Sequence, residues 1–257
     1  MKALKSMVRA VFFTPVRRLR KRARHAQRQR DEKVLLDHAP LMVQSGPFAG
    51  MNLEGACSPI GPKVLGTHEM ELSALIETIA RGSVQHVVNV GAADGFYAVG
   101  FLRQLPMARA TAFEMLTSHH AHIDALARAN GVRDRLTIHG VCDSSSLSSA
   151  LNRAERTLVL MDVEGAEREL LDVARAPGLR YAQILVEVHD FVDPQISGLL
   201  RERFEATHDL TAHRSRPRTL DDLPLVPGVD VAVLLRLADE GRPAQMEWFW
   251  LEPHAVA

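Results

Sequence analysis

The residues best suited to chemistry in this chain are acids and a histidine that stand directly after apolar, strand-like runs. Glu114, Asp162 and His189 each occupy such a position, and Cys142-Asp143 follow a fourth run. Carboxylate and imidazole groups accept or donate hydrogen bonds and exchange protons. A purely structural sheet does not need polar residues gathered at one end of its strands, so this pattern indicates a ligand-binding edge.

A tight turn of small residues precedes these acids. The strand-like run Val87–Val90 ends in Gly91–Gly95, and a helix-like pattern follows. Such a turn lets backbone amides and a helix N-terminus approach a ligand closely. Glu114, nineteen residues past Gly95, ends the next strand-like run and could accept hydrogen bonds from two ribose hydroxyls. Strand, turn, helix and strand-end acid together predict a nucleotide-ribose site.

The glycine spacing decides between nucleotides. A dinucleotide-binding turn has its second and third glycines where this chain has Ala93 and Phe96. The sequence therefore disfavours a pyrophosphate-binding site, and with it an NAD-dependent oxidoreductase. The turn instead resembles the D/E-x-G-x-x-x-G turn of class I S-adenosylmethionine (SAM) methyltransferases, with Asn89 in place of the usual acid. Asp143 could face the adenine amine or cap the serine-rich helix after it. The predicted cofactor-binding residues are Asn89, Gly91, Ala92, Asp94, Gly95, Glu114 and Asp143.

The segment Asp162–Glu167 carries three acids. Glu164 and Glu167 suit the first turn of a helix, where acids complement the helix dipole, whereas Asp162 ends the strand and should point into the crevice. Asp162 and His189 are the predicted catalytic residues, either of which could act as general base. Two other interpretations of His189 stay open: a structural histidine, and a metal ligand together with Asp162. Because no chelating spacing is visible, the sequence predicts no metal.

Four segments together resemble the FkbM-like methyltransferases. They are VNVGAADGFY from Val88, Ala112-Phe-Glu, MDVEGAE from Met161 and LVEVH from Leu185. The resemblance covers about residues 84–190. It implies a class I SAM-dependent enzyme, and several members methylate hydroxyls of natural products or sugars. We therefore expect SAM as cofactor and a small-molecule or glycan acceptor for O-methylation.

Alternating strands and helices should position these residues. Strands are expected at 84–90, 109–114, 135–141, 157–162 and 181–188, and helices at 95–104, 118–129, 145–153, 166–175 and 194–205. Near-continuous apolar strands joined by helices predict an α/β fold with a doubly wound, mostly parallel sheet. Two late strands, Val231–Leu237 and Met246–Leu251, should add an antiparallel edge hairpin and complete a seven-stranded, Rossmann-like sheet.

Charge is distributed unevenly along the 257 residues, although the formal net charge is zero. Residues 1–33 form a basic arm with twelve Lys and Arg and two acids, which leaves the rest acidic. The arm could pack on the body or on a second subunit, or bind an anionic membrane surface; we expect no nucleic acid. Residues 34–66 are an irregular lead-in, and 67–257 form the methyltransferase domain.

Two cysteines without a C-x-x-C motif favour a reducing compartment. The longest uncharged run of the arm, Ala10 to Val16, is too short to span a bilayer. We therefore expect a cytoplasmic protein, with the arm as a means of peripheral attachment to the inner membrane face. The alternative function is a non-catalytic scaffold or accessory protein with a SAM fold, associated with the membrane through this arm.

Overall fold

A seven-stranded sheet organises the chain. The computed structural model describes residues 14–151, 155–242 and 244–254, of which 14–21 are described by backbone alone. The strand order is β3-β2-β1-β4-β5-β7-β6. The five parallel strands are β1 (His86–Val90), β2 (Arg109–Phe113), β3 (Leu136–His139), β4 (Thr157–Met161) and β5 (Gln183–Val188). β7 (Glu247–Pro253) pairs antiparallel with β5 and with β6 (His208–Arg214). The fold class predicted from the sequence is thus confirmed.

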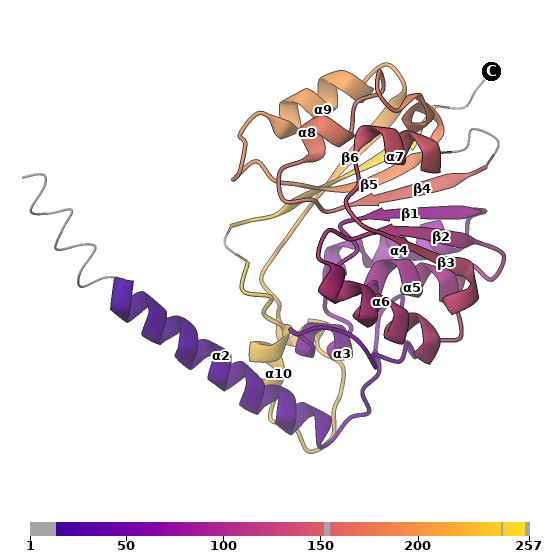
Figure 1. Cartoon of the computed structure of the whole chain (residues 1–257). Helices are drawn as coiled ribbons and strands as arrows, with labels where there is room; N and C mark the ends of the chain where they lie inside the picture. Colours follow the sequence, from indigo (N-terminus) through magenta and orange to yellow (C-terminus); the bar gives the residue numbers. More distant parts are fainter. Residues whose placement is uncertain (1–13, 152–154, 243, 255–257) are drawn as a thin grey trace, which may run out of the picture.

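Helices cover both faces of this sheet (Figure 1). One face packs on α4 (Ser73–Ala80), α5 (Phe96–Gln104) and α6 (Thr117–Ala129). The other packs on α7 (Ser144–Ala150), α8 (Glu167–Leu170) and α9 (Ile196–Phe204). Side chains alternate along a strand, so Val87 points to the first layer and Val88 to the second. Every residue of β1 and β4 is buried, which explains why both strands are mostly apolar.

The edge hairpin is present, but one of its predicted strands was wrong. Residues Val231–Ala238 form a helix, α10, whose N-cap Asp230 accepts a hydrogen bond from the backbone N–H of Ala232 at 2.7 Å. Leu234, Leu237 and Ala238 are buried at helical spacing. The true partner of β7 is β6, at residues for which the sequence predicted no element. β6 is an edge strand with little buried surface, so its hydrophobic alternation is weak.

Several other elements are shorter than predicted. α8 ends at Leu170 rather than near 175, and β3 ends at His139, so that a short loop precedes Cys142. The end of the helix expected at 145–153 falls on 152–154, outside the described residues. Before α4, the chain forms a 3-10 turn, η2 (Met70–Leu72). The five repeating units nevertheless follow one another in the predicted order.

The lead-in and the C-terminal half of the basic arm pack on the body. Phe48, Met51 and Leu53 are buried in the first hydrophobic layer, and α3 (Gly61–Leu65) is wholly buried. The arm residues from Thr14 onward form a long helix, α2 (Thr14–Leu36), whose C-terminal part lies beside α10 and α3 (Figure 1). Among the described helices, none is both long and apolar enough to cross a membrane.

Two buried acids attach α2. Asp31 accepts hydrogen bonds from Arg236 Nε at 2.8 Å and Nη2 at 2.9 Å. Glu32 accepts one from the backbone N–H of Ile60 at 2.9 Å. The Arg236 guanidinium holds the pKa of Asp31 below its ordinary value. The arm therefore contributes to the folded body at its C-terminal end.

Asp31→Asn is expected to lower the free energy of unfolding by about 1–2 kcal/mol, because Arg236 loses a bidentate charged partner but stays half exposed. Urea denaturation measures this change. Asp37→Asn is the matched control, since Asp37 pairs with Lys33 only in an exposed i,i+4 ion pair and should lose less than about 0.5 kcal/mol. Equal stability of the two variants would contradict a structural role for Asp31.

Candidate functional site

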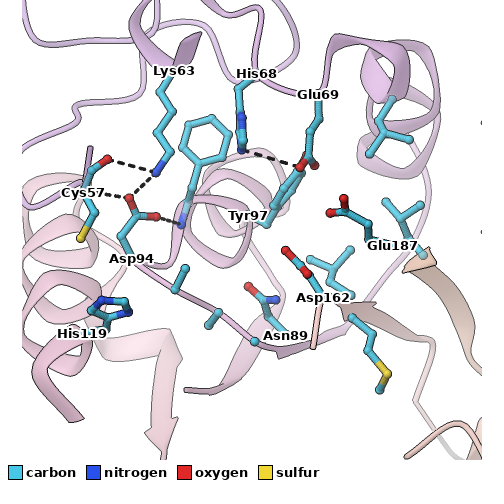
Figure 2. A pocket seen from close by; sticks show the side chains of 18 of the residues that line it. Cys57, Lys63, His68, Glu69, Asn89, Asp94, Tyr97, His119, Asp162 and Glu187 are labelled. Carbon is cyan, nitrogen blue, oxygen red and sulfur yellow. Dashed lines mark hydrogen bonds and ion pairs between the residues drawn. The ribbon is translucent and has the colours of Figure 1, made fainter. Parts of the chain in front are cut away.

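A cavity of about 350 Å³ lies at the carboxyl ends of β1, β4 and β5 (Figure 2). From β1 the sheet continues to β2 and β3 on one side and to β4 and β5 on the other. The cavity lies at this switch point, the position at which open α/β sheets bind ligands. Five predicted site residues line it, and four do not. Lining the cavity are Asn89, Gly91, Ala92, Asp94 and Asp162, whereas Gly95, Glu114, Asp143 and His189 lie around it.

The glycine turn is packed tightly against the segment after β4. Gly91 has a φ of 77°, and a Cβ there would lie 1.7 Å from the carbonyl oxygen of Asp162. Gly95, with a φ of 84°, is the N-cap of α5. Ala93 has a φ of 50°, a conformation that L residues adopt at some cost. The turn therefore depends on close packing against the chain itself, and its approach to a ligand stays a prediction.

Asp94 is a structural acid within this turn. Its Oδ2 forms an ion pair with Lys63 of α3 and accepts a hydrogen bond from the backbone N–H of Cys57 at 2.7 Å. Burial alone would raise the pKa of Asp94, but Lys63 outweighs it and holds that pKa below its ordinary value. Lys63 also lines the cavity and was missed from sequence, because its segment has no readable periodicity.

Glu114 supports the turn from the end of β2. Its Oε2 accepts a hydrogen bond from the backbone N–H of Ala93, and its Oε1 one from Leu116, both at 2.8 Å. The side chain is buried. The acid thus fixes the backbone of the ligand turn directly. Its contact with ribose hydroxyls remains a prediction.

Asp143 adopts the capping alternative. Its Oδ1 accepts a hydrogen bond from the backbone N–H of Ser146 at 2.7 Å, and Ser146 Oγ accepts one in return from the backbone N–H of Asp143 at 2.9 Å. This capping box starts α7. Its contact with adenine is a separate prediction, for an exposed residue outside the cavity lining.

Asn89 carries the most informative orphan atom of the cavity. The residue is 5% exposed and comes from β1, and its amide lies beside Asp162 (Figure 2). Its Oδ1 is buried and has no hydrogen-bond partner among the described residues. A buried acceptor without a partner costs about 1–3 kcal/mol, so such groups are rare unless a ligand or water completes them.

Asp162 and His189, predicted as catalytic, are brought together. His189 Nε2 lies 3.5 Å from Asp162 Oδ1 and 3.6 Å from Glu164 Oε2. On its other side, Nδ1 hydrogen-bonds Glu167 Oε1 at 2.5 Å, with Glu167 fully buried. Only Asp162 of the catalytic pair faces the cavity, and its side chain is 52% exposed.

The electrostatics of the pair separate their roles. Partial burial and the charge of Glu69 raise the pKa of Asp162 to about 6. Burial alone would lower the pKa of His189, but the hydrogen bond and charge of Glu167, with Asp162, outweigh it and raise the pKa to about 9. A protonated imidazole is no base. Of the two candidates, the pKa values favour Asp162 as proton acceptor.

A second acidic group at the cavity was absent from the predicted site. Glu69 precedes η2, and Glu187 lies on β5 with its pKa raised to about 8 by burial and by the charges of Glu69 and Asp162. Arg242 donates to Glu187 Oε1 and Glu69 Oε1, both at 2.8 Å, and Tyr97 donates to Glu69. Glu187 stands two residues before His189, so strand alternation could have identified it. Glu69 and Arg242 come from segments without such a pattern.

Comparisons with known proteins found similarity to solved structures alone. No protein-family model and no curated protein matches the chain. Solved structures are similar at low identity. An O-methyltransferase from Bacillus cereus in complex with SAH is 12% identical, with 88% of this chain and 91% of that one covered and a TM-score of 0.49. The O-methyltransferase TomG from Streptomyces achromogenes, in complex with SAM, is 14% identical, with 78% and 82% covered and a TM-score of 0.45.

A third similar structure is the precorrin-6y C5,15-methyltransferase from Geobacter metallireducens, which is 10% identical. The similarity covers 71% of this chain and 87% of that one, with a TM-score of 0.46.

Proposed function

We propose that this chain is a SAM-dependent methyltransferase of the FkbM-like type, which methylates a hydroxyl of a small-molecule or glycan acceptor. The observation that carries the proposal is the orphan Oδ1 of Asn89, at the glycine turn of a cavity located where α/β sheets bind nucleotides. The ammonium group of SAM offers the donor that this acceptor lacks. A cavity of about 350 Å³ also falls within the range of small-molecule sites, roughly 300–1,000 Å³.

The surrounding residues fit this ligand. The backbone of Gly91–Gly95, held by Glu114 and by the Lys63–Asp94 pair, forms a closely approachable wall. The carboxylates of Asp162 and Glu69 make the neighbouring wall negative, which suits a ligand that carries a sulfonium. When bound, SAM supplies an electrophilic methyl group on that sulfonium.

Asp162 has the position and the exposure to receive the acceptor's proton. A carboxylate at the cavity wall can accept a hydrogen bond from an acceptor hydroxyl, align its oxygen and take the proton that it loses. His189 lies on the buried side of Asp162, with its Nε2 3.5 Å from Asp162 Oδ1, and limits the orientations open to that carboxylate. Turnover measured with labelled SAM across sugars, polyketides and lipid-linked hydroxyls tests the acceptor class. SAM binding without transfer to any of them would favour the scaffold alternative.

Asn89→Leu is expected to weaken binding of SAM or its analogue sinefungin by about 1.5–3 kcal/mol, the contribution of a hydrogen bond to a charged group. The apolar side chain is nearly isosteric but cannot accept from the ammonium. Asn89→Asp is the companion variant, and we expect it to bind at least as tightly as the parent because it adds a charge. Isothermal titration calorimetry measures both. Equal affinity of Asn89→Leu and parent would remove Asn89 from the site.

A further inference from the structure

Three side chains cluster at the edge of the cavity, and one of them, Asp162, also lines it. Asp162 follows β4, Glu164 lies in the turn before α8, and His189 follows β5. Each offers one potential ligand atom, and these atoms all lie within 4.8 Å of one another. Oxygen and imidazole nitrogen donors in one small cluster form a donor set typical of divalent metal ions.

His189 is held in the orientation that a metal ligand requires. The ring is 2% exposed, and its Nδ1 donates to the fully buried Glu167. No residue in the described part of the chain hydrogen-bonds Nε2, which points toward the two carboxylates. Metal-binding histidines almost always donate their second ring N–H to a carboxylate, which fixes the tautomer and raises ligand basicity. Glu167 meets that description.

The distances favour a shared ion over a direct salt bridge. A charged hydrogen bond between imidazolium and carboxylate has its heavy atoms about 2.7–2.9 Å apart. The separations of Nε2 from Asp162 Oδ1 and Glu164 Oε2 are 3.5 and 3.6 Å. Two ligands at about 2.1 Å from one tetrahedral ion lie roughly 3.4 Å from each other. The separation of Nε2 from each carboxylate therefore matches the spacing of two ligands on one ion.

An ion can reach this position from solvent. The side chains of Asp162 and Glu164 are 52% and 78% exposed, whereas His189 closes the buried side. The two carboxylates give the cluster two negative charges that a divalent cation balances. A similar group, His68 with Glu69 and Glu240, is already occupied by a cation, because Arg242 donates to both of its carboxylates.

We propose that Asp162, Glu164 and His189 bind a divalent transition-metal ion such as Mn²⁺ or Zn²⁺, with Glu167 as the positioning residue behind His189. Asp162 would use Oδ1 for the ion and keep its other oxygen for the cavity. An ion there lies at the edge of the cavity, where it can polarise an acceptor hydroxyl; this role, unlike the binding itself, rests on the proposed function.

The test is Mn²⁺ binding to the full chain after removal of metals with EDTA. Free Mn²⁺ measured by electron paramagnetic resonance should show one saturable site per chain, with a dissociation constant below about 100 μM. Glu164→Gln, at an exposed position that leaves folding intact, should weaken binding at least tenfold. Glu169→Gln removes an equal charge from an exposed position on α8, outside the cluster, and should bind like the parent.

Absence of saturable Mn²⁺ and Zn²⁺ binding to the parent would overturn the proposal, as would equal binding by Glu164→Gln and Glu169→Gln. SAH binding is measured separately in EDTA, so the two proposals fail independently. Mn²⁺ binding without SAH binding would support the metal site and contradict the proposed methyltransferase function. SAH binding without Mn²⁺ binding would do the reverse.

Discussion

Replacing Gly91 with alanine is expected to abolish SAM binding and to lower the free energy of unfolding by more than about 3 kcal/mol. The new methyl carbon would lie 1.7 Å from the Asp162 carbonyl oxygen, in a backbone conformation with a φ of 77°. No rotamer relieves this contact, because both atoms belong to the backbone frame. The turn and the segment after β4 must separate, and both walls of the cavity then move.

Gly131→Ala isolates the clash from the conformational strain. Gly131 also has a positive φ, 66°, but a Cβ there would have no neighbour within 4 Å. We expect it to lose only about 1–2 kcal/mol and to keep full affinity. Chemical denaturation and calorimetry of both variants give the comparison. If Gly91→Ala matched Gly131→Ala in both measurements, close packing of the turn would not be needed for folding or binding.

Asp162→Asn is expected to reduce turnover by about 10²–10⁴-fold, the usual contribution of a general base. The amide is nearly isosteric and still faces the cavity, but it cannot take a proton. SAM affinity and the melting temperature should change little, because the glycine turn does not depend on this side chain. Radiolabelled methyl transfer to the identified acceptor, with calorimetry and thermal denaturation in parallel, measures the three quantities.

Glu164→Gln separates proton transfer from metal binding in the same assay. Glu164 belongs to the proposed ion cluster but does not line the cavity. If both variants lose turnover and added Mn²⁺ restores only Glu164→Gln, the base and the ion act separately. Full turnover by Asp162→Asn would assign Asp162 a structural role and move the search for a base elsewhere.

The alternating strands and helices of the core could be predicted because burial leaves its mark on the residue types within each element. A strand covered on both faces must be largely apolar, so β1, β4 and β5 are visible as near-continuous apolar runs. Parallel strands place their carboxyl ends at one edge, so the sequence alone could bring Asp162 and His189 together. The sharp turn at Gly91 follows equally from residue type, because only small residues allow such an approach.

The remainder of the site could not be predicted, because its contacts are set by tertiary packing. Lys63, Glu69 and Arg242 come from three segments outside the alternating strands and helices, and only the folded chain shows that they meet around the cavity. Glu167 was expected to complement a helix dipole, but it is buried against His189. The strand predicted at Val231–Leu237 failed because its β-branched start resembles a strand, while burial at 234, 237 and 238 selects a helix.

Lys63 lies outside the alternating strands and helices, yet it neutralises a carboxylate inside the ligand turn. Removing one partner of a buried ion pair costs about 3–5 kcal/mol, because the other charge stays buried without compensation. A chimera that joins residues 67–254 to a foreign lead-in would carry that uncompensated charge at Asp94. Recombination between related chains can therefore preserve this site only when α3 and the glycine turn are inherited together, as a single unit of exchange.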